Sequence, residues 1–150
     1  MARRYNVNGS AANGTNLTLL TVVSAATVRP RIYDVVVGSV ATPADQAARL
    51  QLNRFTAAGT AGSAVTPQAL DPADPSALSS SGLAVFSVEP TYTANATLLD
   101  IALNQRATYR WVAAPGSELV APATASNGIG LRSISSTAAY ANICTILFEE

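Results

Sequence analysis

The sequence of 150 residues contains no histidine and no lysine, and it has one cysteine and one methionine. These absences exclude Ser-His-Asp, Cys-His and Ser-Lys catalysis, as well as zinc sites built on histidine and cysteine. A P-loop would need its lysine, and Gly128-Ile129-Gly130 lacks the rest of a dinucleotide-binding fingerprint. Cys144 lies in an apolar run, which predicts a buried, unreactive thiol. We therefore expect a protein that is not an enzyme and has no cofactor and no metal.

Charge is also scarce. Charged residues make up 12% of the chain, against about 25% in an average protein, and the formal net charge is zero. All nine positive charges are arginines. Low charge without net repulsion favours association, so one interpretation is a surface covered by further copies or by a larger assembly. The alternative is that the low charge only reflects an alanine-rich, GC-biased gene.

Several partner classes find no support. The first ten residues, MARRYNVNGS, contain no apolar segment of the kind found in signal peptides. No apolar run reaches the ~18 residues that cross a bilayer. The arginines are spread along the chain and balanced by acids, so no basic patch for nucleic acid is visible. We expect synthesis in the cytoplasm, with no membrane, nucleic-acid or small-molecule partner.

Short β-rich runs alternate with Gly, Pro, Asn and Ser at nearly regular intervals, the pattern of a sandwich or barrel. The predicted strands are Leu17–Ser24, Arg31–Ser39, Ala48–Thr56, Ala84–Glu89, Ala96–Asn104, Thr108–Ala113, Gly130–Ser135 and Tyr140–Glu149. Weaker strand signals lie at Arg4–Val7, Ser63–Pro67 and Glu118–Val120. One or two helical turns are predicted at Thr42–Arg49, which has a capping threonine followed by proline.

Periodicity adds two expectations. Leu50 and Leu52 alternate with polar residues, which predicts a strand with one buried face. The last strand is apolar on both faces. It should therefore be covered on both sides, either by a second sheet and a neighbouring subunit or by loops.

The main irregular region is Thr56–Gly82. Its Asp71-Pro72-Ala73-Asp74-Pro75 segment is typical of turns, because each proline biases the preceding aspartate away from helical angles. A calcium site at Asp71 and Asp74 is the alternative. Long loops in small domains usually contact something else, so we expect this region to take part in an interface.

Two pairs of arginines stand close together in the sequence, Arg3-Arg4 and Arg29-Pro30-Arg31. The planar guanidinium group suits interface hydrogen bonds to carboxylates and carbonyls. Arg106, Arg110 and Trp111 with Tyr109 form a second possible contact cluster, with aromatic core packing as the alternative.

Four stretches carry a resemblance to a known family: Arg31–Ser39 (RIYDVVVGS), Asn53–Thr60 (NRFTAAGT), Val88–Thr93 (VEPTYT) and Leu103–Trp111 (LNQRATYRW). They resemble capsid decoration (cement) proteins of tailed bacteriophages and cyanophages. The resemblance implies a single-domain, all-β, antiparallel β-sandwich of jelly-roll-like form. It also implies a homotrimer on the outer capsid surface of the virion, where it clamps neighbouring major capsid proteins.

The expected organisation is an N-terminal arm or first short strand over residues 1–16 and a β-sandwich domain over residues 17–150. The expected partners are the major capsid protein and further copies of the chain. One alternative function is a tail or fibre module that binds host-surface glycans through an exposed Trp111 or tyrosines. Another is a carboxylate-dependent glycoside hydrolase, which needs two acids roughly 5–10 Å apart. The candidate capsid or subunit contacts are Arg3, Arg4, Tyr5, Arg29, Arg31, Asp71 and Asp74.

Overall fold

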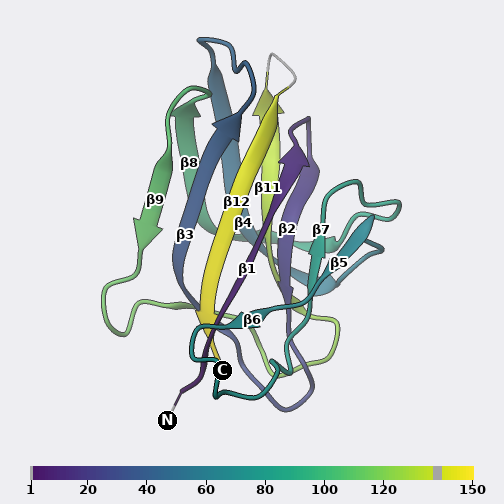
Figure 1. Ribbon diagram of the computed structural model, residues 1–150. Helices are drawn as coiled ribbons and strands as arrows, with labels where there is room; N and C mark the ends of the chain where they lie inside the picture. The colour runs from purple at the N-terminus through teal and green to yellow at the C-terminus, as the bar shows by residue number, and fades with distance from the viewer. Residues whose placement is uncertain (1, 137–139) are drawn as a thin grey trace.

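The computed structural model describes residues 2–136 and 140–150, and these contain β-strands and loops but no helix (Figure 1). Met1, the first residue of the expected arm, and residues 137–139 of the expected sandwich domain lie outside the described residues. The strands are β1 (Arg4–Ala12), β2 (Leu17–Val23), β3 (Arg31–Val40), β4 (Ala47–Ala57), β5 (Ser63–Val65), β6 (Gln68–Ala69), β7 (Ser81–Leu83), β8 (Thr91–Asn104), β9 (Tyr109–Val112), β10 (Leu119–Val120), β11 (Gly128–Ser136) and β12 (Ala141–Glu149).

The strands form two antiparallel sheets. Sheet A has the order β10-β3-β12-β1-β6, and β9 also pairs with β3. Sheet B has the order β5-β7-β2-β11-β4-β8. The sheets pack face to face around one apolar core, which confirms the predicted all-β sandwich.

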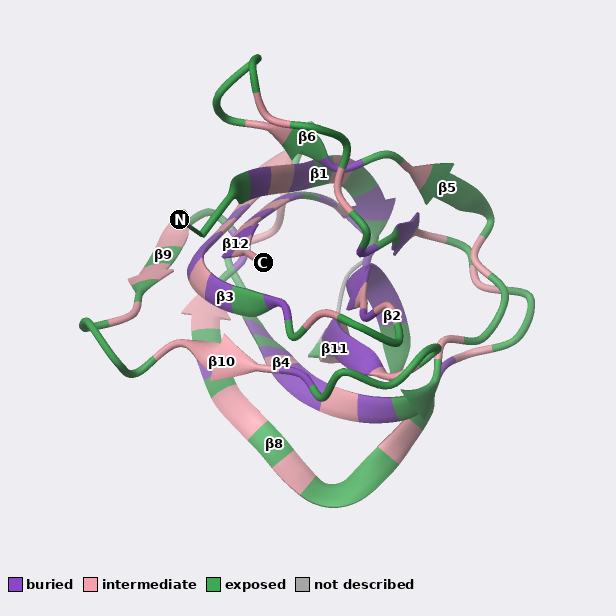
Figure 2. Cartoon of the chain, turned by 90° about the horizontal axis from the view of Figure 1, so that it is seen from below, coloured by how far each residue is buried: buried purple, intermediate pink, exposed green. Residues whose placement is uncertain are grey.

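The core follows from alternation along the strands. In β4, Leu50 and Leu52 are fully buried while Arg49 is exposed, as predicted from their spacing. Leu50 lies opposite the buried Ile101 of β8. Figure 2 shows the buried residues on the strands that surround the interior. The largest fully buried apolar side chains are Tyr5, Phe55, Phe148, Leu19, Leu20, Ile32, Leu50, Leu52, Ile129, Leu131 and Ile146.

Two glycines of β11 make room for aromatic rings. A Cβ atom at Gly128 would lie 2.5 Å from the Phe55 ring, and one at Gly130 would lie 2.3 Å from the Tyr92 hydroxyl. Phe55 and Tyr92 meet edge to face, with ring centroids 6.0 Å apart. The absence of side chains at Gly128 and Gly130 therefore leaves space for the rings of Phe55 and Tyr92 on sheet B.

β1 is longer than the predicted Arg4–Val7 segment. It runs to Ala12 between β12 and β6, and its register pairs Arg4 with Glu149 and Ala12 with Ala141. Tyr5 and Val7 face the core and are buried. Residues 4–12 of the expected arm are thus part of sheet A.

Two local predictions were wrong. Ala84–Glu89 does not form a strand, because Ala84 (φ 43°) and Val85 (φ 46°) are in the left-handed region. The nearby strand is β7 instead. Thr42–Arg49 forms no helix, since Ala47 onwards belongs to β4, where pairing with β8 and β11 outweighs a weak helical preference.

Candidate functional site

Six of the seven predicted contact residues gather at the end of the sandwich where β1 begins and β12 ends. We call this region the terminal end; it comprises residues 2–4, 27–31, 70–75 and 149–150. A surface pocket of about 460 Å³ is lined by Ala2, Thr27, Val28, Arg29, Arg31, Glu149 and Glu150. A neighbouring pocket of about 530 Å³ is lined by Ala2, Arg4, Leu70, Asp71, Asp74 and Glu149. Sequence segments that are far apart are therefore brought together here.

Sheet pairing and turn chemistry position the acids of the second pocket. Arg4 lies opposite Glu149 in the β1–β12 register, with Arg4 Nε 4.0 Å from Glu149 Oε2. Arg3 Nε lies 3.9 Å from Asp74 Oδ1. Asp71 Oδ1 accepts a hydrogen bond from Ala73 N at 2.9 Å, which is the predicted turn. The two ion pairs are long and exposed, so they contribute little to stability.

Glu150 fastens the 70–80 loop to the strand ends. Its carboxylate accepts hydrogen bonds from Leu78 N at 2.6 Å and from Ser79 N at 3.1 Å. Its backbone exchanges hydrogen bonds with Arg3 at 3.0 and 3.1 Å. Sequence reasoning missed both Glu149 and Glu150 as members of the site, because their position depends on the pairing of the first strand with the last.

Tyr5, the seventh predicted contact residue, is fully buried. Its ring stacks on Phe148 with centroids 5.6 Å apart, and its hydroxyl donates a hydrogen bond to the Pro75 carbonyl at 3.0 Å. Alternation in β1 turns Tyr5 inward although its neighbour Arg4 is exposed. Tyr5 therefore holds the 70–80 loop through a hydrogen bond, and its side chain is not accessible to a partner.

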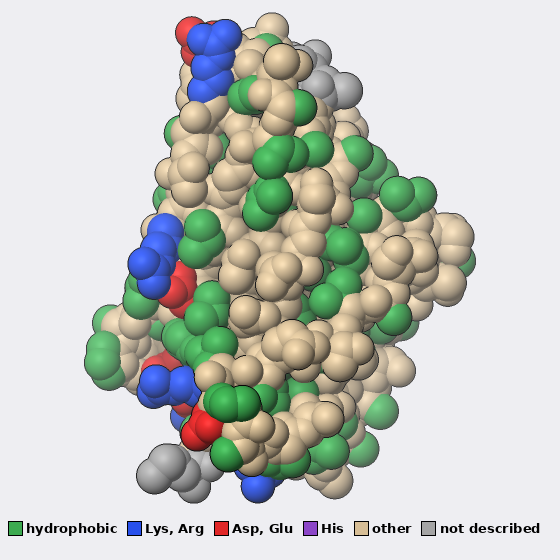
Figure 3. Space-filling model, in the orientation of Figure 1, with side chains coloured by type: hydrophobic (Ala, Val, Ile, Leu, Met, Phe, Trp, Pro, Cys, Tyr) green, Lys and Arg blue, Asp and Glu red, His purple; other side chains and the backbone are tan. Residues whose placement is uncertain are grey.

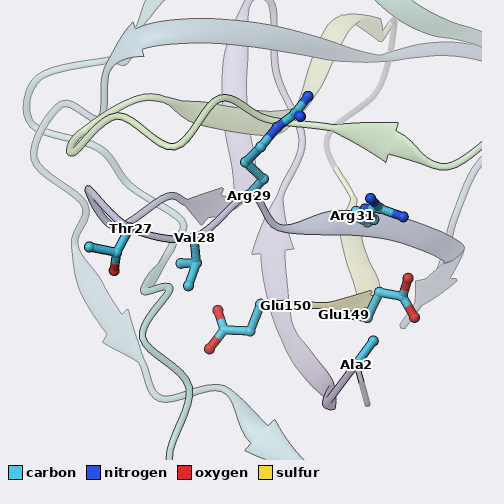
Figure 4. A pocket seen from close by; sticks show the side chains of 7 residues that line it. All are labelled: Ala2, Thr27, Val28, Arg29, Arg31, Glu149 and Glu150. Atoms are coloured by element: carbon cyan, nitrogen blue, oxygen red, sulfur yellow. The ribbon is translucent and has the colours of Figure 1, made fainter.

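Arg29 and Arg31 differ from the other arginines. Arg3, Arg4, Arg49 and Arg110 form ion pairs, Arg54 and Arg106 donate to backbone carbonyls, and Arg132 lies over the Tyr92 ring. The exposed guanidinium groups of Arg29 and Arg31 have no hydrogen bond or ion pair with any residue in 2–136 or 140–150. In Figure 4, Arg31 lies near Glu149, and Arg29 points away from Glu150.

The charge of Arg31 also acts on Glu118, which directly precedes β10. Backbone hydrogen bonds from the N–H groups of Glu118 itself and of Gly116 lower the pKa of Glu118, and the positive charge of Arg31 lowers it further. The terminal end combines four arginines with the carboxyl groups of Asp71, Asp74, Glu149 and Glu150. Many of its side chains are charged, and two of its arginines form neither a hydrogen bond nor an ion pair with the described residues.

The described residues contain no group of three His, Cys, Asp or Glu side chains that could hold a metal ion. Of the acids at the second pocket, Asp74 lies beside Arg3 and Glu149 beside Arg4. Burial raises the pKa of Cys144 to about 12, in keeping with the predicted inert thiol.

The second predicted contact cluster divides between two faces. Tyr109 and Trp111 pack against the core, which confirms the aromatic-packing alternative. Arg110 points outward and pairs with Asp34. Trp111 is half-buried, so it offers little ring surface to a sugar.

No family model, no curated protein and no solved structure matches this chain. No helix within the described ranges is long and apolar enough to cross a membrane.

Proposed function

We propose that this chain is a non-enzymatic structural subunit of a virus particle. It would decorate and stabilise a phage capsid as a trimer, by bridging neighbouring major capsid proteins on the outer surface. The terminal end carries the proposal, because it joins the predicted contact residues of four separate segments in one charged surface. The resemblance of the sequence to capsid decoration proteins supports the same function.

The contact would be made by a preformed surface. Residues 4–12 are fixed within sheet A, so the terminal end presents the ends of strands and the 70–80 loop rather than an extended arm. Rigid presentation lowers the entropy lost on binding. Arg29 and Arg31 would donate hydrogen bonds to carboxylates or carbonyls of the shell, for which the guanidinium fork is well suited.

The proposed mechanism is passive. Each copy adds buried area and hydrogen bonds across the boundary between capsid proteins, which raises the free energy needed to separate them. A trimer that engages several shell subunits at once would bind with much higher avidity than one isolated contact. Because exposed arginines make part of the contact, binding should weaken as ionic strength rises.

The test uses shells assembled from the major capsid protein encoded in the same genome, mixed with the purified chain. We expect the chain to co-sediment with the shells and to raise the temperature at which they break open. The double variant Arg29→Ser/Arg31→Ser should bind at least tenfold more weakly, which corresponds to about 1.4 kcal/mol. Arg49→Ser changes an exposed arginine that pairs with Asp100 on sheet B; it is the matched control and should bind like the wild type.

Two outcomes would overturn the proposal: no co-sedimentation with the shells, or decorated and bare shells that open at the same temperature. Equal binding by the double variant and the wild type would remove Arg29 and Arg31 from the contact. Binding of the chain to a host-glycan array would favour the tail or fibre alternative instead.

A further inference from the structure

The outward face of sheet A carries exposed side chains on neighbouring strands. It consists of the outward residues of Asn6–Ala12 in β1 and their cross-strand partners in β12 and β3, and we call it the open face. Cross-strand pairing arranges them in rows, given from β1 through β12 to β3: Ala12–Ala141–Val40, Ser10–Ile143–Gly38, Asn8–Thr145–Val36 and Asn6–Leu147–Asp34. The next row, Arg4–Glu149–Arg31, belongs to the terminal end. Asn8, Ser10 and Ile143, in the middle rows, are exposed. The inner side of β12 is covered by sheet B as predicted, and its outer side has no cover among the described residues.

The open face is almost free of charge. Asp34 is the one charged residue in its four rows, and it is 4% exposed. Arg110 of the neighbouring β9 neutralises it, with Nη2 2.5 Å from Oδ2 and Nε 3.1 Å from Oδ1. Figure 3 shows this side of the molecule, with charged groups along one margin and at the lower end and none in the centre.

Apolar side chains lie along the middle of this face, with Thr145 between Ile143 and Leu147, and we call them the apolar ridge. Ile143 is 46% exposed, and Val36 and Leu147 beside it are half-buried. Val112 on β9, at the margin, is 56% exposed. Next to the ridge, β1 presents a column of amide and hydroxyl groups from Asn6, Asn8 and Ser10.

The size of the face fits a protein contact. The four rows span Asn6–Ala12 of β1, which at about 3.3 Å per residue and about 4.8 Å per strand gives a face of roughly 23 Å by 15 Å. This is less than the about 800 Å² per partner of a stable interface, and it fits the smaller area of a weak, reversible contact.

We propose that the open face packs against further copies of this chain. A nucleic acid, an anionic membrane or a charged peptide would find no counter-charge there, and its own charges would lose water without compensation. Two neutral faces meet without that cost. The apolar ridges bury each other, and the amide and hydroxyl columns supply both donors and acceptors for hydrogen bonds between copies.

The test measures self-association of the purified chain alone, so it does not depend on any capsid. The mass is followed by sedimentation velocity up to about 100 μM, where even a contact with a Kd of tens of micromolar is populated. We expect a multiple of 15.4 kDa. Ile143→Arg places a charge on the exposed ridge and should weaken association at least tenfold.

Asn8→Arg provides a second variant of the open face, on a different strand. Val88→Arg is the matched control, because Val88 is 60% exposed in the loop before β8 and lies outside the open face. Circular dichroism checks that each variant keeps the wild-type spectrum. A wild-type monomer at every concentration would overturn the inference, and so would oligomers that persist in both open-face variants. Loss of association in Val88→Arg alone would place the contact on that loop and would equally overturn it.

The results separate this inference from the proposed function. An oligomer that dissociates in Ile143→Arg but never binds shells would support the open-face contact and overturn capsid decoration. A monomer that binds shells would support capsid decoration and overturn the open-face contact.

Discussion

The sharpest stability prediction concerns Gly130, which lies against the Tyr92 ring in sheet B. A methyl group at this position would lie 2.3 Å from the Tyr92 hydroxyl oxygen and 3.1 Å from Cζ. The ring cannot move freely. Its hydroxyl is 2.7 Å from Thr18 Oγ1, and the Arg132 guanidinium carbon lies 4.0 Å from its centroid. Gly130→Ala should therefore displace a side chain that is held on several sides.

The magnitude follows from these contacts. Overpacking of this kind costs about 1–3 kcal/mol, and loss of the hydroxyl hydrogen bond to Thr18 adds about 1 kcal/mol. Replacing a strand glycine by alanine returns about 0.5–1 kcal/mol through backbone entropy. We expect a net loss of about 2 kcal/mol in the free energy of unfolding.

A second substitution isolates the cause. Tyr92→Phe removes the oxygen atom nearest to the added methyl group and should cost about 1 kcal/mol alone. In that background Gly130→Ala should be much less harmful, because the remaining ring atoms lie at 3.1 Å or more. The double-mutant cycle should therefore show a favourable coupling of about 1 kcal/mol.

Urea unfolding followed by the fluorescence of Trp111 measures all four proteins, since Trp111 packs against the core and is the single tryptophan. A loss of 2 kcal/mol should lower the urea midpoint by about 1 M. The reasoning is refuted if Gly130→Ala unfolds at the wild-type midpoint. It is also refuted if the two costs add to within about 0.3 kcal/mol.

Three further predictions follow from buried or paired groups. Burial raises the pKa of Cys144 from 9.0 to about 12. The thiol therefore ionises first in the unfolded chain, and the free energy of unfolding falls as pH rises from 9 towards 12. Urea unfolding should show a shallower decline in Cys144→Ala. The hydrogen bond from Arg49 lowers the pKa of Asp100 from 3.8 to about 2, so the stability linked to Asp100 is lost as pH falls through this range. Arg49→Gln should move that pKa towards 3.8 in a carboxyl NMR titration, and an unchanged value would contradict the assignment. Tyr5→Phe keeps the ring but loses the hydrogen bond to Pro75, so it should cost about 1 kcal/mol and speed amide exchange in the 70–80 loop, whereas unchanged exchange would argue against this anchor.

Strands with a strong local pattern could be predicted from the sequence. The alternation around Leu50 and Leu52 identified β4 because inward and outward residues differ sharply in polarity. β1 carries the same alternation from Tyr5 to Ala11, but Gly9 and Ala11 give a weak apolar signal, so its second half was missed. The contrast between apolar and polar residues along a strand, rather than the length of the strand, decided which strands could be predicted.

The failure at Ala84–Glu89 has a different cause. The segment is apolar enough for a strand, but tertiary contacts fix its backbone. Gly62 N donates to the Ala84 carbonyl at 3.0 Å, and Thr60 N donates to the Val88 carbonyl at 2.8 Å. These bonds join two loops that are more than twenty residues apart in sequence, and no local pattern contains them.

The site could be predicted where the residue type alone indicates a contact or a turn. Paired arginines and the Asp-Pro turns stand out in the sequence, whereas Glu149 becomes a neighbour of Arg4 only through the β1–β12 register. Tyr5 shows the opposite error, because proximity to Arg3 and Arg4 in sequence suggested a shared surface. The alternation of a strand separates adjacent residues to opposite faces.

The arrangement of the few charges divides the surface into two kinds of contact. Most arginines are bound within their own chain, and the two unbound ones, among the described residues, lie at the terminal end. A contact there depends on charge, so added salt should weaken it. The open face has no exposed charge in its four rows, and burial of apolar surface is not weakened by salt screening. Ionic strength should therefore weaken the proposed shell contact and leave the proposed contact between copies unaffected.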